Sequence, residues 1–169
     1  MSWPGDERSK DMAERILVVD DDKGVREALG EFLLSLGYGV VLAENGQEAL
    51  SKYRSGEFDI IMADLIMPTM DGMELLRRVR DFKNDEVIFL MITGHPSIGT
   101  AVEAINQGAD DYITKPFHLE DVKQRLTKCL EKQTLKGRLK TAQGLAWGLM
   151  LSIPLWLLLG IILVLLFKG

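Results

Sequence analysis

The sequence predicts an α/β fold: a doubly wound, five-stranded parallel sheet with helices on both faces, followed by one C-terminal transmembrane helix. The sheet is predicted because apolar, β-branched runs alternate with amphipathic helical patterns between residues 15 and 130. Such alternation is typical of parallel strands joined by right-handed crossovers. The membrane helix is predicted by a second observation, an uncharged run of 23 residues at 145–167.

Five short apolar runs are the expected strands. In chain order they are RILVVD at 15–20, VVLA at 40–43, FDIIMA at 58–63, VIFLMI at 87–92 and DYIT at 111–114. Parallel sheets of this kind place their chemistry beyond the C-terminal ends of the strands. The residues that end each run are therefore the first candidates for a functional site.

Apolar residues that recur every three or four positions predict a helix after each strand. The first helix has an apolar face formed by Val25, Leu29, Phe32 and Leu36. The later helices are expected at 46–54, 72–81, 98–107 and 119–130. In the helix at 98–107, we expect Val102 and Ile105 to point inward.

Composition restricts the function classes. The chain has 169 residues and a formal charge of −5, which argues against a nucleic-acid-binding protein because such proteins usually present a basic face. Its single cysteine, Cys129, excludes an internal disulfide framework and fits a reducing compartment. Residues 1–14 are polar and lack the apolar segment of a signal peptide, so we expect a disordered lead-in.

Charged and polar side chains follow four of the expected strands. They are Asp20 and Asp21 after the first strand, Asp64 after the third, Thr93 after the fourth and Lys115 after the fifth. Three neighbouring carboxylates repel one another unless their pKa values rise or a cation joins them, and an all-oxygen set suits Mg²⁺. A cation, an ammonium and a hydroxyl around one carboxylate predict phosphoryl transfer, with Asp64 as the nucleophile.

Four stretches, ILVVDDD, MADLIMPTMDG, MITG and YITKPF, resemble in order and spacing the receiver domain of bacterial two-component response regulators. The resemblance covers residues 15–130 and implies a flavodoxin-like sheet of strand order 2-1-3-4-5. It also implies Mg²⁺-dependent transfer of a phosphoryl group from a sensor histidine kinase to Asp64. Since such a domain catalyses only its own phosphorylation and dephosphorylation, we do not expect a conventional enzyme.

The resemblance implies a role for each matching position. The metal ligands would be Asp21 directly, Asp20 through water, Asp64, and the backbone carbonyl of Ile66. The phosphate would be sensed by the switch pair Thr93 and Tyr112 and bound by Lys115, which would precede a cis Lys115–Pro116 bond. Hydrolysis would be modulated by Ile66 and His95. Because the Ile66 side chain cannot hydrogen-bond water, we expect it to shield the phosphate and prolong the phosphorylated state.

Some residues in these stretches have a purely structural interpretation. We expect Asp22 and Asp71 to cap helices rather than to join the site. Tyr112 has an alternative role as plain core, because an aromatic residue in a short strand is often buried packing. His95 and His118 are expected in surface loops.

The apolar run at 145–167 would form a helix of ~34 Å, enough to cross a bilayer core of ~30 Å. Trp147 lies near one end, where interfacial aromatic residues belong. The linker at 131–144 carries the basic residues Lys132, Lys136, Arg138 and Lys140. By the positive-inside rule, they predict a single-pass protein of the bacterial inner membrane with its receiver domain in the cytoplasm.

These features favour a membrane-anchored, single-domain response regulator. Its output would be a phosphorylation-dependent contact with a protein target, through the face of the fourth helix, fifth strand and fifth helix that the family uses. Gly144 and Gly148 form a GxxxG pattern that would favour a homodimer. Two alternatives stay open: a phosphate sink without a target, and the N-terminal receiver of a longer membrane protein.

Overall fold

The computed structural model describes residues 13–53, 58–82, 86–137 and 139 of the chain. The chain divides into two units, Met1–Cys129 and Leu130–Gly169. The first unit holds the sheet and its helices. In the second, residues 130–137 and 139 are helical.

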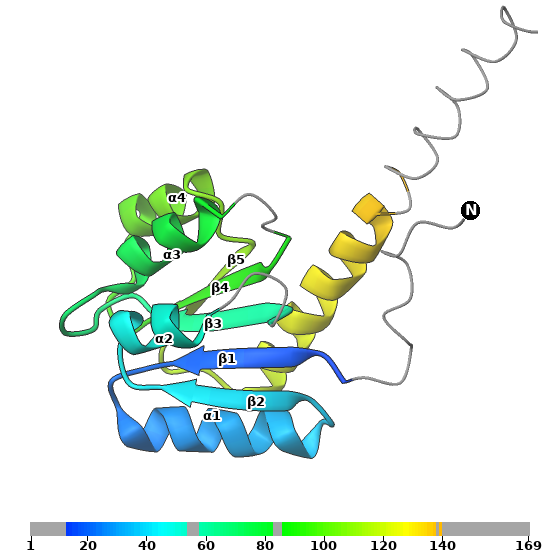
Figure 1. The fold of residues 1–169 in the computed structure, drawn as a ribbon, viewed down its shortest axis with the longest axis horizontal. Helices are drawn as coiled ribbons and strands as arrows, with labels where there is room; N and C mark the ends of the chain where they lie inside the picture. Colours follow the sequence, from blue (N-terminus) through cyan, green and yellow to red (C-terminus); the bar gives the residue numbers. More distant parts are fainter. Residues whose placement is uncertain (1–12, 54–57, 83–85, 138, 140–169) are drawn as a thin grey trace, which may run out of the picture. The chain divides into compact units, whose positions relative to one another are not determined.

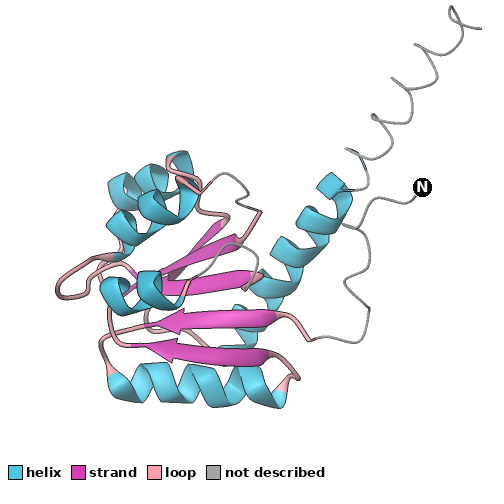
Figure 2. Ribbon diagram, viewed as in Figure 1, coloured by secondary structure: helices cyan, strands magenta, loops and turns pink. Residues whose placement is uncertain are grey.

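All five predicted strands are present and pair in parallel (Figures 1 and 2). They are β1 (Arg15–Val19), β2 (Gly39–Ala43), β3 (Ile60–Asp64), β4 (Ile88–Thr93) and β5 (Asp111–Thr114). Their order in the sheet is β2-β1-β3-β4-β5. The predicted five-stranded parallel sheet and its order 2-1-3-4-5 are therefore confirmed.

A helix follows each strand. Four of them are α1 (Lys23–Ser35), α2 (Gly46–Lys52), α3 (Gly72–Arg80) and α4 (Ile98–Asn106), and a further helix begins at residue 119. Asp22 and Asp71 accept hydrogen bonds from backbone amides at the starts of α1 and α3. Both residues are therefore helix caps, as predicted, and each cap satisfies amides that the helix itself leaves unpaired.

Helices cover both faces of the sheet. Strand side chains alternate between the two faces, and both sets are apolar, so both faces are buried. On one face, Leu17, Ile61 and Phe89 belong to a buried cluster with residues of α2, α3 and α4. The neighbouring residues along β1, β3 and β4 are also buried. Residues of α1 and of the helix 119–129 supply the remaining buried apolar side chains, among them Leu29, Leu33, Val122, Leu126 and Cys129.

The prediction for the inward face of α4 is wrong. Val102 and Ile105 are 53% and 47% exposed, and Ile98 is 86% exposed. The buried residue of α4 is Ala104. The spacing of Ile98, Val102 and Ile105 does place them on one side of the helix, but that side faces solvent because the small Ala104 packs against the sheet. We call these three residues the α4 stripe.

Other sequence predictions fall partly or wholly outside the described residues. The transmembrane helix at 145–167 lies wholly outside, as do residues 1–12 of the lead-in and most of the linker beyond residue 137. Within the part of the chain that is described, no helix is long and apolar enough to cross a membrane.

The loop between β3 and α3 contains a strained residue. Thr69 has a φ of 70°, in the left-handed region that β-branched residues rarely adopt. The Met70 amide donates to the Pro68 carbonyl at 2.8 Å, which closes a tight three-residue turn around Thr69. This turn lies in the loop that follows Asp64, so the strain is stored next to the strand ends.

We predict that Thr69→Gly raises the free energy of unfolding by about 0.5–1 kcal/mol, because glycine relieves the strain at positive φ but loses more entropy on folding. Urea unfolding measures the change. The control is Thr127→Gly in the helix that begins at residue 119, where glycine should instead destabilise the protein. Destabilisation by both substitutions would show that Thr69 is not strained.

Candidate functional site

Strand register brings the predicted polar residues to one edge of the sheet. Val19 of β1 pairs with Ala63 of β3, so the next residues, Asp20 and Asp64, are neighbours. On the other side, Thr93 of β4 pairs with Thr114 of β5, and Lys115 follows directly. The site is therefore a consequence of parallel pairing, since each of these residues is the last of its strand or directly follows it.

The Lys115 side chain joins the two sides of this edge. Its Nζ donates to Asp20 Oδ2 at 2.6 Å and to Asp64 Oδ2 at 2.9 Å. Its backbone amide donates to the Thr93 carbonyl at 2.6 Å, which continues the ladder one residue beyond β5. The Lys115–Pro116 bond is cis, as predicted.

The three carboxylates form one acidic pocket. Asp20, Asp21 and Asp64 each offer an oxygen, and these oxygens all lie within 4.8 Å of one another. Asp20 and Asp64 are buried, whereas Asp21 is exposed. The pocket therefore has a buried floor and one solvent-facing donor, an arrangement through which an ion could enter.

Burial raises the pKa of the Asp20 carboxyl more than the Lys115 ammonium lowers it. Burial also lowers the pKa of Lys115, but its hydrogen bonds to Asp20 and Asp64 raise that pKa overall. The pKa of Asp20 and the pKa of Lys115 are both raised, because the shared ion pair outweighs burial for Lys115 but not for Asp20. One ammonium gains from two carboxylates, while Asp20 receives part of one cation and feels the charge of Asp64.

One oxygen of the pocket has no hydrogen-bond partner in the described part of the chain. Asp64 Oδ1 is buried and unpaired, whereas its Oδ2 is bonded to Lys115. A buried carboxylate oxygen without a partner is costly. Together with the oxygens of Asp20 and Asp21, it gives the all-oxygen donor set that Mg²⁺ prefers, so the residues present fit this ion.

The backbone behind Asp64 is held by close packing at Gly72, the first residue of α3. The Gly72 amide donates to the Leu65 carbonyl at 3.0 Å. A Cβ at Gly72 would collide with the Asp64 carbonyl oxygen and would lie 2.9 Å from Met91 Sδ. Because only glycine fits there, α3 packs directly against the backbone that carries the buried carboxylate.

Sequence analysis missed Arg26 of α1. Its guanidinium donates to the backbone carbonyl of Asp20 and so supports the loop that carries Asp20 and Asp21. Its position one turn into α1, four residues after the cap Asp22, was the available signal. Without a structure, that position could not be distinguished from an ordinary exposed helix residue.

The two predicted switch residues, Thr93 and Tyr112, have different hydrogen-bond partners. Thr93 is fully buried, and its hydroxyl accepts the His95 amide at 3.1 Å. The Tyr112 hydroxyl lies 3.1 Å from Thr100 Oγ1 of α4. Ile66 is 54% exposed at the start of the loop after β3, and the side chains of His95 and His118 are exposed in loops, as predicted for the two histidines.

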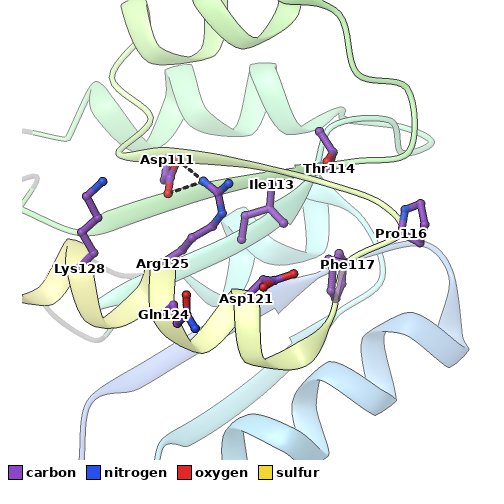
Figure 3. A pocket seen from close by; sticks show the side chains of 9 residues that line it. All are labelled: Asp111, Ile113, Thr114, Pro116, Phe117, Asp121, Gln124, Arg125 and Lys128. Atoms are coloured by element: carbon purple, nitrogen blue, oxygen red, sulfur yellow. Dashed lines mark hydrogen bonds and ion pairs between the residues drawn. The ribbon is translucent and has the colours of Figure 1, made fainter.

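A groove of about 500 Å³ lies between β5 and the helix that begins at residue 119 (Figure 3). Arg125 Nη1 donates to both carboxylate oxygens of Asp111, at 3.0 and 2.9 Å, across one end of the groove. Pro116 and Phe117 line the other end. Because these two residues directly follow Lys115, the chain runs from the acidic pocket straight into the groove wall.

Comparison with known families gives one clear match. The sequence model described as the response regulator receiver domain matches residues 16–127. The response regulator MprA of Mycolicibacterium vanbaalenii is 42% identical over 123 residues, which are 73% of this chain and 53% of that protein. MprA of Mycobacterium ulcerans is 41% identical over 125 residues. The chain thus spans about half the length of these curated relatives.

Solved structures give the same result. A CheY-like response regulator receiver domain protein from Methanospirillum hungatei has a TM-score of 0.69 and 31% identity, covering 73% of this chain and 98% of that one. The chemotaxis protein CheY4 of Vibrio cholerae has a TM-score of 0.66 and 32% identity, covering 69% and 98%. The similarity therefore extends over nearly the whole of both solved chains.

Asp20→Asn is predicted to raise the free energy of unfolding at pH 7 in EDTA. The folded pKa of Asp20 lies above its ordinary value of 3.8, so this group's contribution to stability falls as pH rises through that value to the folded pKa. At neutral pH the charged form therefore disfavours folding, and a neutral side chain of the same shape removes that cost. Urea unfolding in EDTA measures the difference.

Saturating Mg²⁺ should then stabilise the wild type more than Asp20→Asn, because the variant lacks one carboxylate donor. The matched control, Asp121→Asn, changes an exposed carboxylate outside the pocket and should have little effect in either buffer. If Asp20→Asn is less stable than the wild type in EDTA, then pairing with Lys115 outweighs burial and the folded pKa of Asp20 is not raised.

Proposed function

Because this chain belongs to the response regulator receiver domain family, we propose that it accepts a phosphoryl group from a sensor histidine kinase on Asp64. The choice of Asp64 rests on the different environments of its two carboxylate oxygens. Oδ2 is held by Lys115, whereas Oδ1 is buried in the acidic pocket without a hydrogen-bond partner among the described residues. Asp64 is therefore the buried carboxylate of the pocket with an oxygen left open for a new bond.

In the proposed step, an electron pair of an Asp64 carboxylate oxygen forms a bond to phosphorus. The bond between phosphorus and the donor's histidine nitrogen breaks, and its electron pair returns to that nitrogen. The product is an acyl phosphate on Asp64. The Lys115 ammonium, already bonded to Asp64, would offset the added negative charge. Thr93 is the last residue of the neighbouring strand β4, and its hydroxyl would donate to a phosphoryl oxygen.

Mg²⁺ bound by Asp20, Asp21 and Asp64 would supply further positive charge against the phosphoryl oxygens. We propose the Ile66 carbonyl as an additional ligand, and Asp20 as a ligand through water. Asp20 is the less suited of the carboxylates to direct ligation, since its Oδ2 is held by Lys115 and its Oδ1 accepts the Asp22 amide at 2.9 Å.

We propose that Ile66 lengthens the life of the acyl phosphate. Its exposed side chain stands at the start of the loop after Asp64 and has no group that could orient an attacking water. His95 is a second candidate, since its imidazole could orient water. We assign the larger effect to Ile66.

For the output, we propose contact with a protein target through the face formed by α4, β5 and the helix that begins at residue 119. The α4 stripe supports this proposal because three large apolar residues stand side by side in solvent there. The groove along β5 adds a polar rim with both signs of charge. A target that places apolar side chains on α4 would bury the stripe.

We propose that the receiver is held at the cytoplasmic face of the inner membrane by residues 145–167. The support comes from the sequence: the run is uncharged and long enough, and basic residues precede it. Lys132 and Lys136 are exposed on the helical segment before that run. Gly144 and Gly148 would be the packing positions if two copies associate.

A longer protein is the second candidate, and the lengths of the relatives favour it. The chain matches about half of each MprA sequence, so an output region could belong to the complete protein. In that case residues 145–167 would be the first membrane segment of a larger protein. A receiver that only drains phosphoryl groups from a kinase is distinguished by having no partner that prefers its phosphorylated form.

We predict that acetyl phosphate with Mg²⁺ labels the wild type and Asp121→Asn but not Asp64→Asn. Only Asp64 combines an unpaired oxygen with a bonded ammonium in the acidic pocket. EDTA should abolish labelling, because charge on the phosphoryl oxygens is then uncompensated. Undiminished labelling of Asp64→Asn would refute the assignment.

Ile66→Asn is predicted to speed the loss of label several-fold, equivalent to roughly 1 kcal/mol of barrier, because an amide can orient the attacking water. The decay of labelled protein after removal of the donor measures the rate. Ile66→Leu serves as the control, since it keeps an apolar side chain and should decay like the wild type. Equal decay of Ile66→Asn and wild type would disprove shielding.

Removing the residues after Gln143 is predicted to move the protein from the membrane fraction to the soluble fraction without loss of labelling. Fractionation of cells that express each form, followed by acetyl phosphate labelling, measures both properties. A shortened protein that cannot fold or be labelled would show that the tail is part of the domain rather than an anchor.

A further inference from the structure

We propose that Thr100 is a positioning residue for the switch, because its hydroxyl holds the Tyr112 side chain against the first turn of α4 in the unphosphorylated protein. This inference rests on the proposed function and adds to it a residue that restrains activation. The observation that carries it is the contact of 3.1 Å between Thr100 Oγ1 and the Tyr112 hydroxyl.

The Thr100 hydroxyl is held by Ser97 on one side and by Tyr112 on the other. A threonine hydroxyl has one hydrogen to donate and two lone pairs to accept with. The Thr100 hydroxyl donates to the Ser97 carbonyl at 3.1 Å and accepts the Ser97 amide at 3.3 Å. Ser97 Oγ also lies 2.9 Å from Thr100 Oγ1, and either hydroxyl of the Thr100–Tyr112 pair can be the donor.

Thr100 is itself fixed by the cap of α4. Its amide donates to Ser97 Oγ at 3.0 Å, and its hydroxyl bonds back to Ser97, which forms a reciprocal capping box. The hydroxyl that bonds Tyr112 is therefore fixed to a defined turn and does not rotate freely. Tyr112 is bonded to the same helix that carries the α4 stripe.

The predicted switch partner of Tyr112 is engaged elsewhere. The Thr93 hydroxyl accepts the His95 amide, and Met91 rather than Thr93 lies opposite Tyr112 in the β4–β5 register. If phosphorylation draws Thr93 toward the new phosphoryl group, a response of Tyr112 requires its bond to Thr100 to break. The bond thus stabilises the unphosphorylated arrangement, by an amount that corresponds to about a two- to tenfold shift in equilibrium.

The test uses the full-length chain in detergent with saturating Mg²⁺ and beryllium fluoride, which mimics the acyl phosphate. Carbon-13 labelling of the tyrosine rings reports on Tyr112, since the chain has only three tyrosines. We expect Thr100→Val to reach half-saturation at about two- to tenfold lower beryllium fluoride than the wild type, because the restraint is gone. Thr100→Ala should behave alike and replaces the valine variant if that variant does not fold.

Two matched variants separate positioning from capping. Thr100→Ser keeps the hydroxyl and should restore the wild-type midpoint. Ser97→Ala removes the cap side chain but leaves the Thr100 hydroxyl, so it should also stay at the wild-type midpoint. An unchanged midpoint in Thr100→Val and Thr100→Ala, or a Ser97→Ala midpoint equal to theirs, overturns the proposal.

The outcomes also distinguish this inference from the proposed function. If the wild type neither binds beryllium fluoride nor takes label from acetyl phosphate, the phosphoryl-acceptor function fails, and the inference fails with it. If the wild type does both and Thr100→Val matches it in midpoint, only the role of Thr100 is wrong.

Discussion

One ammonium shared between two buried carboxylates is the interaction on which this site depends. The Lys115 Nζ lies 2.6 Å from Asp20 and 2.9 Å from Asp64, at the edge of a sheet whose interior is apolar. A single positive charge cannot fully offset two negative charges that have lost their water. The pocket therefore holds more negative than positive charge, and this excess favours the binding of a further cation. An entering cation and the conversion of Asp64 to an acyl phosphate would each change the balance of charge in this pocket.

The rest of the architecture keeps that charge arrangement in register. Parallel pairing sets Asp20 beside Asp64, and the cap Asp71 with the close approach of Gly72 fixes the loop behind them. The strained turn at Thr69 lies in the same loop. Strain of this kind persists only where surrounding contacts over-determine the backbone. The loop is thus held in one shape by its two anchors, the end of β3 and the start of α3.

The sequence predicts features that follow from the order of the strands, and it does not predict features that depend on side-chain packing between elements. The convergence of Asp20, Asp64 and Lys115 was predictable, because each residue ends a strand and parallel strands end at one edge. The side of α4 that faces the sheet was not, because periodicity places Val102 and Ile105 together without saying which side is covered. Ala104 decides the matter only through packing, where a small residue permits close contact. The hydrogen bond between Tyr112 and Thr100 joins β5 to α4 through the tertiary fold, and no local pattern encodes it. The bond of Arg26 to the Asp20 carbonyl spans six residues, but the position of Arg26 in the sequence resembles that of any exposed helix residue.

The continuity of Lys115 with the groove wall has a thermodynamic consequence. Pro116 and Phe117 line the groove, and the residue before them holds both carboxylates of the acidic pocket. If a molecule in the groove prefers the wall in the position that phosphorylation favours, then linkage requires the reverse effect as well. The bound partner would then favour the phosphorylated state of Asp64 by the same factor. The target would then act as an effector of the receiver, and the abundance of the target would set how strongly a given amount of phosphodonor is registered.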